Sequence, residues 1–156
     1  MTGRRLLIEA DGGSRGNPGT AGYGAVVSDA VTREVLAELS EPIGRATNNV
    51  AEYSGLVAGL RAAGKLAPGA PAEVRMDSKL VVEQMSGRWK IKHPALQPLA
   101  AEARQAARAL GRVTYTWIPR ERNKHADRLA NEAMDAAGGA RDGTGGRPRS
   151  GPAGLW

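Results

Sequence analysis

The spacing of hydrophobic and polar positions divides the chain into short strand-like and longer helix-like segments. Short apolar or alternating runs predict five strands, over residues 4–10, 24–28, 35–40, 73–76 and 113–118. Between the first two runs, residues 12–22 are rich in Gly, Asn and Pro, which predicts a turn.

Apolar positions at helical spacing predict four helices, over residues 50–66, 79–85, 95–110 and 123–137. Thr47 or Asn48 can cap the first of them. The order is three strands, helix, strand, two helices, strand and helix, which is typical of an α/β fold with an antiparallel edge on a parallel core.

One domain is expected over residues 1–137, because the composition changes at Gly138. Residues 138–156 are dominated by Gly, Pro, Arg, Ser and Ala, and we interpret them as a disordered tail or a truncated linker. A chain of 156 residues is long enough for one ordinary hydrophobic core.

The charge balance is basic, with 22 Lys and Arg against 16 Asp and Glu and a formal net charge of +6. This balance suits a polyanionic partner such as nucleic acid, although it is also compatible with a simple aid to solubility. The absence of Cys excludes disulfides and thiolate metal sites. The first residues contain no apolar signal segment, so we expect no membrane span and a cytoplasmic location.

Four acidic residues occupy suggestive positions. Asp11 and Asp77 are each expected to end a strand, whereas Glu52 and Asp127 lie near the starts of helices. Each position also has an ordinary structural explanation, as a turn residue, a cap or a charge at a helix N-terminus. Carboxylates brought to one point need neutralising cations, and oxygen ligands suit Mg²⁺ or Mn²⁺. Two such ions can promote cleavage of a phosphodiester.

Several neutral and basic side chains are candidates for substrate contact. Amide groups can recognise a 2′-hydroxyl, and hydroxyl and guanidinium groups can hold a phosphate. The candidates of the first kind are Asn17, Asn48 and Asn49, and those of the second are Ser14, Arg45 and Thr47. Turn and cap chemistry explains some of these residues equally well.

Two basic segments complete the set of candidates. Trp89 lies among Arg and Lys residues, an arrangement that suits a nucleic-acid groove or, alternatively, a solvated loop with the indole folded into the core. We expect the indole to be half-buried. Arg120 precedes Asp127 and is our candidate for assisting catalysis or product release. His125 is expected on the surface, because it does not share a helix face with Asp127. Glu9 is expected to be partly exposed and paired with an Arg.

Four phrases in this order resemble those of type 1 ribonuclease H, over roughly residues 5–137. They are DGGSRGNPG, TNNVAE, DSKLV and ADRLAN. The resemblance implies a ribonuclease H-like fold, with a five-stranded mixed sheet of three antiparallel strands plus parallel strands flanked by helices. It also implies a monomeric endonuclease that cuts the RNA strand of RNA–DNA hybrids with two Mg²⁺ ions, or Mn²⁺ in their place, leaving 5′-phosphate and 3′-hydroxyl ends.

The resemblance also assigns roles to residues. Asp11, Glu52, Asp77 and Asp127 match the metal ligands. Asn17, Asn48 and Asn49 match positions that meet the RNA minor groove, and Ser14, Arg45 and Thr47 match a pocket for a DNA phosphate. The region that matches the loop His of many members holds Arg120 and Arg122, and because some relatives have an Arg in this role we take Arg120 as the candidate. The segment around Trp89 is too short for the basic protrusion that some members carry.

Three further expectations follow. The motifs are most similar to N-terminal domains of actinobacterial bifunctional proteins, in which an acid phosphatase domain follows; no phosphatase motif is present in these residues. A hybrid-binding module without catalysis is the alternative function, but all four acids are present. A proofreading exonuclease is disfavoured, because its first strand carries Asp-x-Glu, whereas this chain has Glu9-x-Asp11.

Overall fold

The computed structural model describes residues 4–141, which form five strands, four α-helices and one 3₁₀ turn. In chain order the elements are β1 (Leu6–Arg15), β2 (Gly19–Asp29), β3 (Val35–Ala46), α1 (Asn48–Leu66), β4 (Ala72–Met76), α2 (Lys79–Met85), α3 (Gln97–Ala107), β5 (Val113–Trp117), the 3₁₀ turn η1 (Arg120–Arg122) and α4 (Lys124–Arg141). All five predicted strands and all four predicted helices are present, and most of their ends shift by a few residues.

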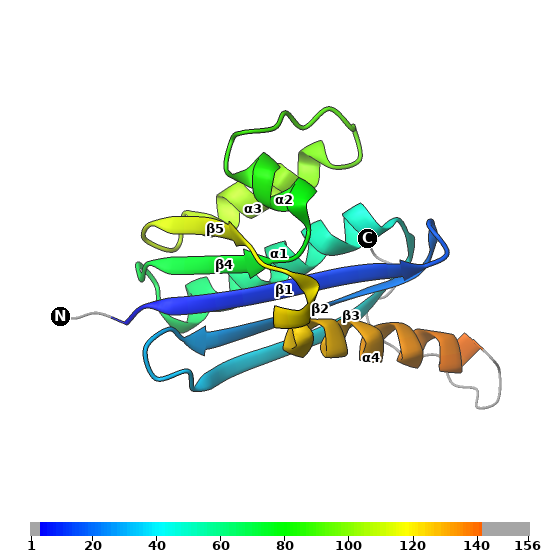
Figure 1. The fold of residues 1–156 in the computed structure, drawn as a ribbon, viewed down its shortest axis with the longest axis horizontal. Coiled ribbons are helices and arrows are strands. Elements are labelled where there is room, and N and C mark those ends of the chain that lie inside the picture. Colours follow the sequence, from blue (N-terminus) through cyan, green and yellow to red (C-terminus); the bar gives the residue numbers. More distant parts are fainter. Residues whose placement is uncertain (1–3, 142–156) are drawn as a thin grey trace.

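The five strands form one mixed sheet in the order β3-β2-β1-β4-β5 (Figure 1). The pairs β1–β2 and β2–β3 are antiparallel, whereas β1–β4 and β4–β5 are parallel. The predicted fold class is therefore confirmed. The short β4 pairs with β1 only over Leu6–Glu9, so the second half of β1 extends beyond its parallel neighbour.

The turn predicted over residues 12–22 is wrong in extent. β1 continues to Arg15 and β2 begins at Gly19, so most of this Gly-rich segment is strand. The glycines are there for packing: a Cβ on Gly12 would lie 2.3 Å from the backbone of Ala51, and one on Gly24 would lie 2.4 Å from the carbonyl oxygen of Ala126. The absence of side chains allows two helices to approach the sheet closely.

These close approaches place α1 and α4 on opposite faces of the sheet (Figure 1). The main core fills the α1 side, where Ile8 and Ala25 of the sheet lie near Gly59 of α1. On the other face, Gly22 and Gly24 contact α4. Because successive strand residues point to opposite faces, Asp11, which pairs with Gly24, points toward α4.

The ends of two helices differ from the prediction. α3 begins at Gln97 rather than residue 95, with Pro98 in its first turn, where a missing N–H costs nothing. α4 continues to Arg141, so the helix passes the expected domain end at residue 137 by four residues. The remainder of the predicted tail, residues 142–156, lies outside the described residues. Within residues 4–141, no helix combines the length and apolarity needed to cross a membrane.

Candidate active site

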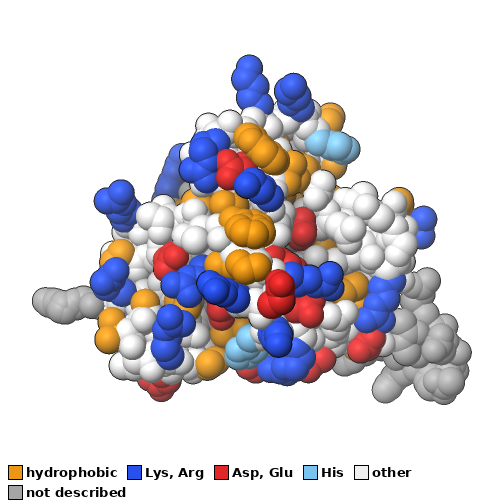
Figure 2. All heavy atoms as spheres, in the orientation of Figure 1, with side chains coloured by type: hydrophobic (Ala, Val, Ile, Leu, Met, Phe, Trp, Pro, Cys, Tyr) orange, Lys and Arg blue, Asp and Glu red, His pale blue; other side chains and the backbone are white. Residues whose placement is uncertain are grey.

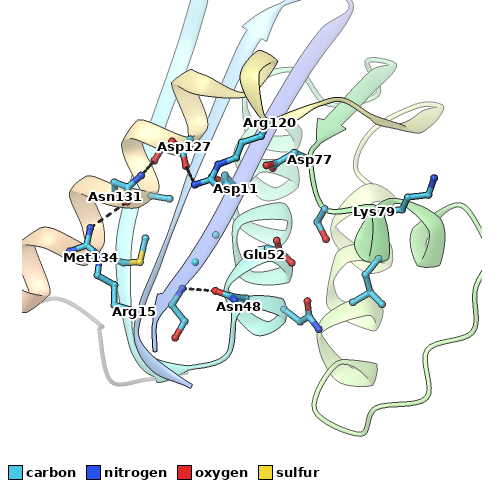
Figure 3. A pocket seen from close by; sticks show the side chains of 17 residues that line it. Asp11, Arg15, Asn48, Glu52, Asp77, Lys79, Arg120, Asp127, Asn131 and Met134 are labelled. Carbon is cyan, nitrogen blue, oxygen red and sulfur yellow. Dashed lines mark hydrogen bonds and ion pairs between the residues drawn. The ribbon is translucent and has the colours of Figure 1, made fainter. Parts of the chain in front are cut away.

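All four predicted acidic residues line one cleft of about 570 Å³. Asp11 comes from β1, Glu52 from α1, Asp77 from the segment after β4, and Asp127 from α4 (Figure 3). The fold therefore brings together four carboxylates that are up to 116 positions apart in the chain, counting from Asp11 to Asp127. The face seen in Figure 2 carries acidic side chains near its centre, with Lys and Arg side chains around them.

The sheet places Asp11 beside Asp77. β1 and β4 are parallel and in register up to Glu9 and Arg75, and β4 ends at Met76. Continuing this register by two residues sets Asp77 opposite Asp11. The expectation that Asp11 ends a strand is wrong, because β1 runs on to Arg15. The strand that ends beside Asp11 is its neighbour β4, at Met76, and the cleft lies beyond this end.

Asp77 is held by two hydrogen bonds from different parts of the chain. The indole Nε1 of Trp117 donates to the carbonyl oxygen of Asp77 at 3.3 Å. The amide Nδ2 of Asn123 donates to Asp77 Oδ1 at 3.1 Å. Both the backbone and the side chain of Asp77 are thus restrained.

Helix starts supply the other two acids. Thr47 caps α1, its hydroxyl accepting from the N–H of Val50 at 3.3 Å, and Glu52 follows in the next turn. Asp127 lies in the first turn of α4, where a negative charge is favourable. Arg120 reaches back to Asp127, with 3.8 Å between Nη2 and Oδ1, and remains largely exposed (Figure 3).

The acids are close enough to disturb one another. Burial and then the charges of Asp77 and Asp127 raise the pKa of Asp11 to about 8. Burial is also the largest cause that raises the pKa of Glu52 to about 7, with a smaller contribution from Asp77. Such shifts are typical of carboxylates that share a site without a cation, and a bound cation would reverse them.

The donor set fits Mg²⁺ or Mn²⁺ in chemistry, because it consists of carboxylate oxygens. Among residues 4–141, however, no three acidic or His side chains converge into a ready-made metal cage. Mg²⁺ does not require one, since it commonly keeps several waters and takes one or two carboxylates together with substrate phosphates.

Asn48, Asn49 and Ser14 line the same cleft. Ser14 N–H donates to Asn48 Oδ1 at 2.8 Å, and the Ser14 hydroxyl donates to the carbonyl of Ala46 at 2.7 Å. Asn17 lies next to the cleft, its Oδ1 accepting from the N–H of Asn48 at 3.0 Å. The amide oxygens of Asn17 and Asn48 therefore serve the protein, as turn and cap chemistry requires. Their NH₂ groups have no described protein acceptor and are left to act as donors.

Besides Asn17, three predicted contact residues lie outside this cleft. Arg45 is exposed on β3, and Thr47 is used as the cap of α1. Trp89 is 46% exposed in the α2–α3 loop and lines a separate pocket with Lys90 and Arg104. The structure thus excludes the alternative in which the indole is folded into the core.

The two remaining candidates also lie away from the acids. His125 Nε2 lies 2.5 Å from Glu38 Oε2, which ties α4 to β3, as expected for a His outside the site. Glu9 does not border the cleft. Within residues 4–141 Glu9 has no Arg partner, because Arg75, its neighbour across the sheet, pairs with Glu73 at 3.2 Å instead.

Sequence analysis missed three residues of the cleft and its wall. Arg15 and Asn131 line the cleft, and Asn123 lies beneath it, 1% exposed. Arg15 and Asn131 are joined by a 3.3 Å hydrogen bond across the cleft wall. Asn123 had a visible signal, an Asn at the start of a predicted helix, but that signal predicts a cap and not a contact with Asp77.

Comparison with known proteins identifies relatives of the chain. Residues 9–133 match a family described as reverse transcriptase-like. The chain is 64% identical over 133 residues to the bifunctional protein Rv2228c of Mycobacterium tuberculosis, which covers 85% of this chain and 36% of that protein. The chain thus matches only about a third of that relative's length. The solved N-terminal RNase H domain of the same protein superimposes with a TM-score of 0.86 at 61% identity, covering 89% of this chain and 99% of that one.

Two further matches extend the comparison. Ribonuclease HI of Halobacterium salinarum is 42% identical over 135 residues, covering 86% of this chain and 67% of that protein. LC11-RNase H1, solved in complex with an RNA/DNA hybrid, gives a TM-score of 0.80 at 41% identity, covering 85% of this chain and 98% of that one.

Proposed function

The chain belongs to the ribonuclease H family, and from this premise we propose that it is an endonuclease that hydrolyses the RNA strand of RNA–DNA hybrids. The observation that carries the proposal is that Asp11, Glu52, Asp77 and Asp127 all line one cleft. The hybrid bound to a relative that is 41% identical supports the choice of substrate.

We propose Asp11, Glu52, Asp77 and Asp127 as the groups that would hold two Mg²⁺ ions. When bound, the ions would activate water and neutralise charge at the scissile phosphate. The raised pKa of Asp11 is consistent with this role, because an uncompensated carboxylate at this position stays protonated near neutral pH. The products would carry 5′-phosphate and 3′-hydroxyl ends.

The remaining groups of the cleft would orient the substrate. The free NH₂ groups of Asn17 and Asn48 are donors that suit acceptor atoms of the RNA strand, and Asn49 is exposed beside them. Ser14, Arg45 and Thr47 are proposed to meet a phosphate of the DNA strand, and Trp89 to meet the hybrid farther along. Arg120 would move between Asp127 and a phosphate, because its present contact is long and its side chain is exposed.

The test is cleavage of an end-labelled RNA–DNA hybrid in Mg²⁺, beside double-stranded RNA, single-stranded RNA and double-stranded DNA, each repeated with EDTA. Internal cuts confined to the RNA strand of the hybrid, and lost with EDTA, are the expected result. Binding of the hybrid without cleavage in Mg²⁺ or Mn²⁺ would instead support a non-catalytic binding module. A cytoplasmic location and a monomeric state stay predictions, and gel filtration checks the second.

A further inference from the structure

We propose that Asn123 is the positioning residue that assembles the acidic cluster. Its side chain is buried between β1, the segment after β4 and the start of α4, at 1% exposure. Its Nδ2 donates both to the carbonyl oxygen of Ala10 at 3.0 Å and to Asp77 Oδ1 at 3.1 Å. One amide group therefore links the strand that carries Asp11 to the carboxylate of Asp77.

The main chain of Asn123 extends the link to a third acid. The carbonyl oxygen of Asn123 accepts the N–H of Asp127 at 3.0 Å, the first helical hydrogen bond of α4. Asn123 thus contacts Asp77 directly, Asp127 through the backbone, and Asp11 through the residue before it. Its side chain and backbone set the spacing of three acids that come from three separate elements.

The chemistry of the contacts determines which end of the amide faces the acids. Ala10 O and an ionised Asp77 can only accept hydrogen bonds, so the NH₂ end must face them. Asp, Leu or Ser could not donate to both at this distance and in this direction. A bond at Asp77 Oδ1 also leaves Oδ2 available to a cation, since an ionised carboxylate has about four acceptor positions.

The other end of the same amide indicates that the residue is there for the site and not for stability. Within residues 4–141, Asn123 Oδ1 is the one buried side-chain polar atom without a hydrogen-bond partner. A buried acceptor without a partner weakens folding, and native proteins keep few of them. The cost of the unpartnered Asn123 Oδ1 is explained if the two hydrogen bonds donated by Nδ2 are needed to orient Asp77. Residues that orient metal ligands through hydrogen bonds commonly increase the affinity of the site for the metal.

The test measures metal affinity without substrate, so that it does not depend on the nuclease proposal beyond the assumption that the acids hold a cation. The 156-residue chain carrying Asn123→Ala or Asn123→Ser is titrated with Mn²⁺, and free Mn²⁺ is followed by its EPR signal. We expect a loss of affinity of roughly tenfold or more in both variants. Affinity for the hybrid, measured in EDTA, should stay within about twofold of wild type.

The matched control is Ser40→Ala. Ser40 Oγ donates to the carbonyl oxygen of Leu129 at 2.6 Å, so this change also removes a hydrogen bond that holds α4, but from β3 and away from the cleft. We expect its Mn²⁺ affinity to be unchanged. Ser is a preferred N-cap residue, so Asn123→Ser tests the proposal if Asn123→Ala does not fold.

Two results would overturn the proposal: Mn²⁺ affinity within twofold of wild type in a folded Asn123 variant, or an equal loss in Ser40→Ala. Cleavage of the hybrid is then measured separately. A wild type that binds Mn²⁺ in an Asn123-dependent way but cuts no hybrid would contradict the proposed function and leave the role of Asn123 standing.

Discussion

At the scale of single residues, the chain concentrates its unusual chemistry in a few buried polar groups. Asp11 and Glu52 are carboxylates with raised pKa values, and Asn123 is a buried amide with one end unsatisfied. Each of these features weakens folding on its own. Their presence in one place is typical of a functional site, where local stability is sacrificed for chemistry.

Asp77→Asn should nearly abolish cleavage while leaving hybrid binding intact. The change removes a negative charge from the proposed metal site but keeps the size of the side chain and its backbone contact with Trp117. Loss of several kcal/mol of electrostatic stabilisation corresponds to a fall in kcat of roughly a thousandfold. Turnover is measured in Mg²⁺ and affinity in EDTA; turnover close to wild type would refute the assignment of Asp77.

The metal-free protein should lose stability as the pH rises from about 4 to 8. The pKa of Asp11 is about 8 in the folded state but 3.8 in the unfolded chain, so between these values only the unfolded chain releases this proton. Folding is therefore opposed progressively as pH increases, and the full effect is reached above pH 8. Glu52, with a folded pKa of about 7, contributes in the same direction.

Asp11→Asn should consequently stabilise the metal-free protein at pH 8 and change it little at pH 4. An effect of about 1 kcal/mol would raise Tm by roughly 2–4 °C in a chain of this size. Thermal unfolding in EDTA measures this, and Mg²⁺ should stabilise the wild type more than the variant. A lower Tm for the variant at pH 8 would contradict the electrostatic explanation.

At the scale of elements, glycines in the strands decide how closely the helices approach and therefore where their acids lie. A Cβ on Gly24 would lie 2.4 Å from the carbonyl oxygen of Ala126 and 2.5 Å from the Cβ of Leu129. Both atoms belong to α4, one turn or less from Asp127. The position of this acid thus depends on a strand residue that has no side chain.

Gly24→Ala should destabilise the fold by about 1–3 kcal/mol and reduce cleavage, because α4 must move away from the sheet. Gly13→Ala is the matched control for stability. It adds the same methyl group to β1, where the nearest atom is the flexible Cε of Met134 at 3.2 Å. Chemical denaturation of both variants measures the difference; equal stability would show that α4 tolerates the displacement.

At the scale of the whole molecule, the charges are distributed so that an acidic cleft lies within a basic surface. The chain carries a formal net charge of +6, although four carboxylates line its cleft. On the face seen in Figure 2, Lys and Arg side chains lie around the acidic ones. Basic groups outside the cleft can attract a polyanion from a distance, whereas the acids would meet its phosphates only through cations. The net positive charge of the chain therefore favours the approach of a polyanion, whereas the acids of the cleft act after it has bound.

Hybrid binding should accordingly weaken with salt. If two or more phosphates are neutralised, affinity should fall roughly tenfold or more between 50 and 200 mM salt, because counterions are released on binding. Fluorescence anisotropy in EDTA measures this directly. An affinity independent of salt would show that the basic surface does not contact the backbone of the hybrid.

The sequence by itself determined the fold class, the element order and the identity of the four acids. Hydrophobic periodicity is a local property, so α2 was predicted to the residue over 79–85 and β4 to within one residue. The acids stood out because each lies in a distinctive phrase at an element end or helix start. Thr47 as the cap of α1 was equally visible.

The tertiary structure decided what depends on neighbours that are distant in the chain. The glycines of residues 12–22 predicted a turn, because nothing local shows that α1 and α4 press against them. The roles of Asn123 and Trp117 at Asp77 likewise depend on contacts across 46 and 40 positions. Packing and hydrogen bonding between elements, and not local propensity, set the geometry in which the four acids meet.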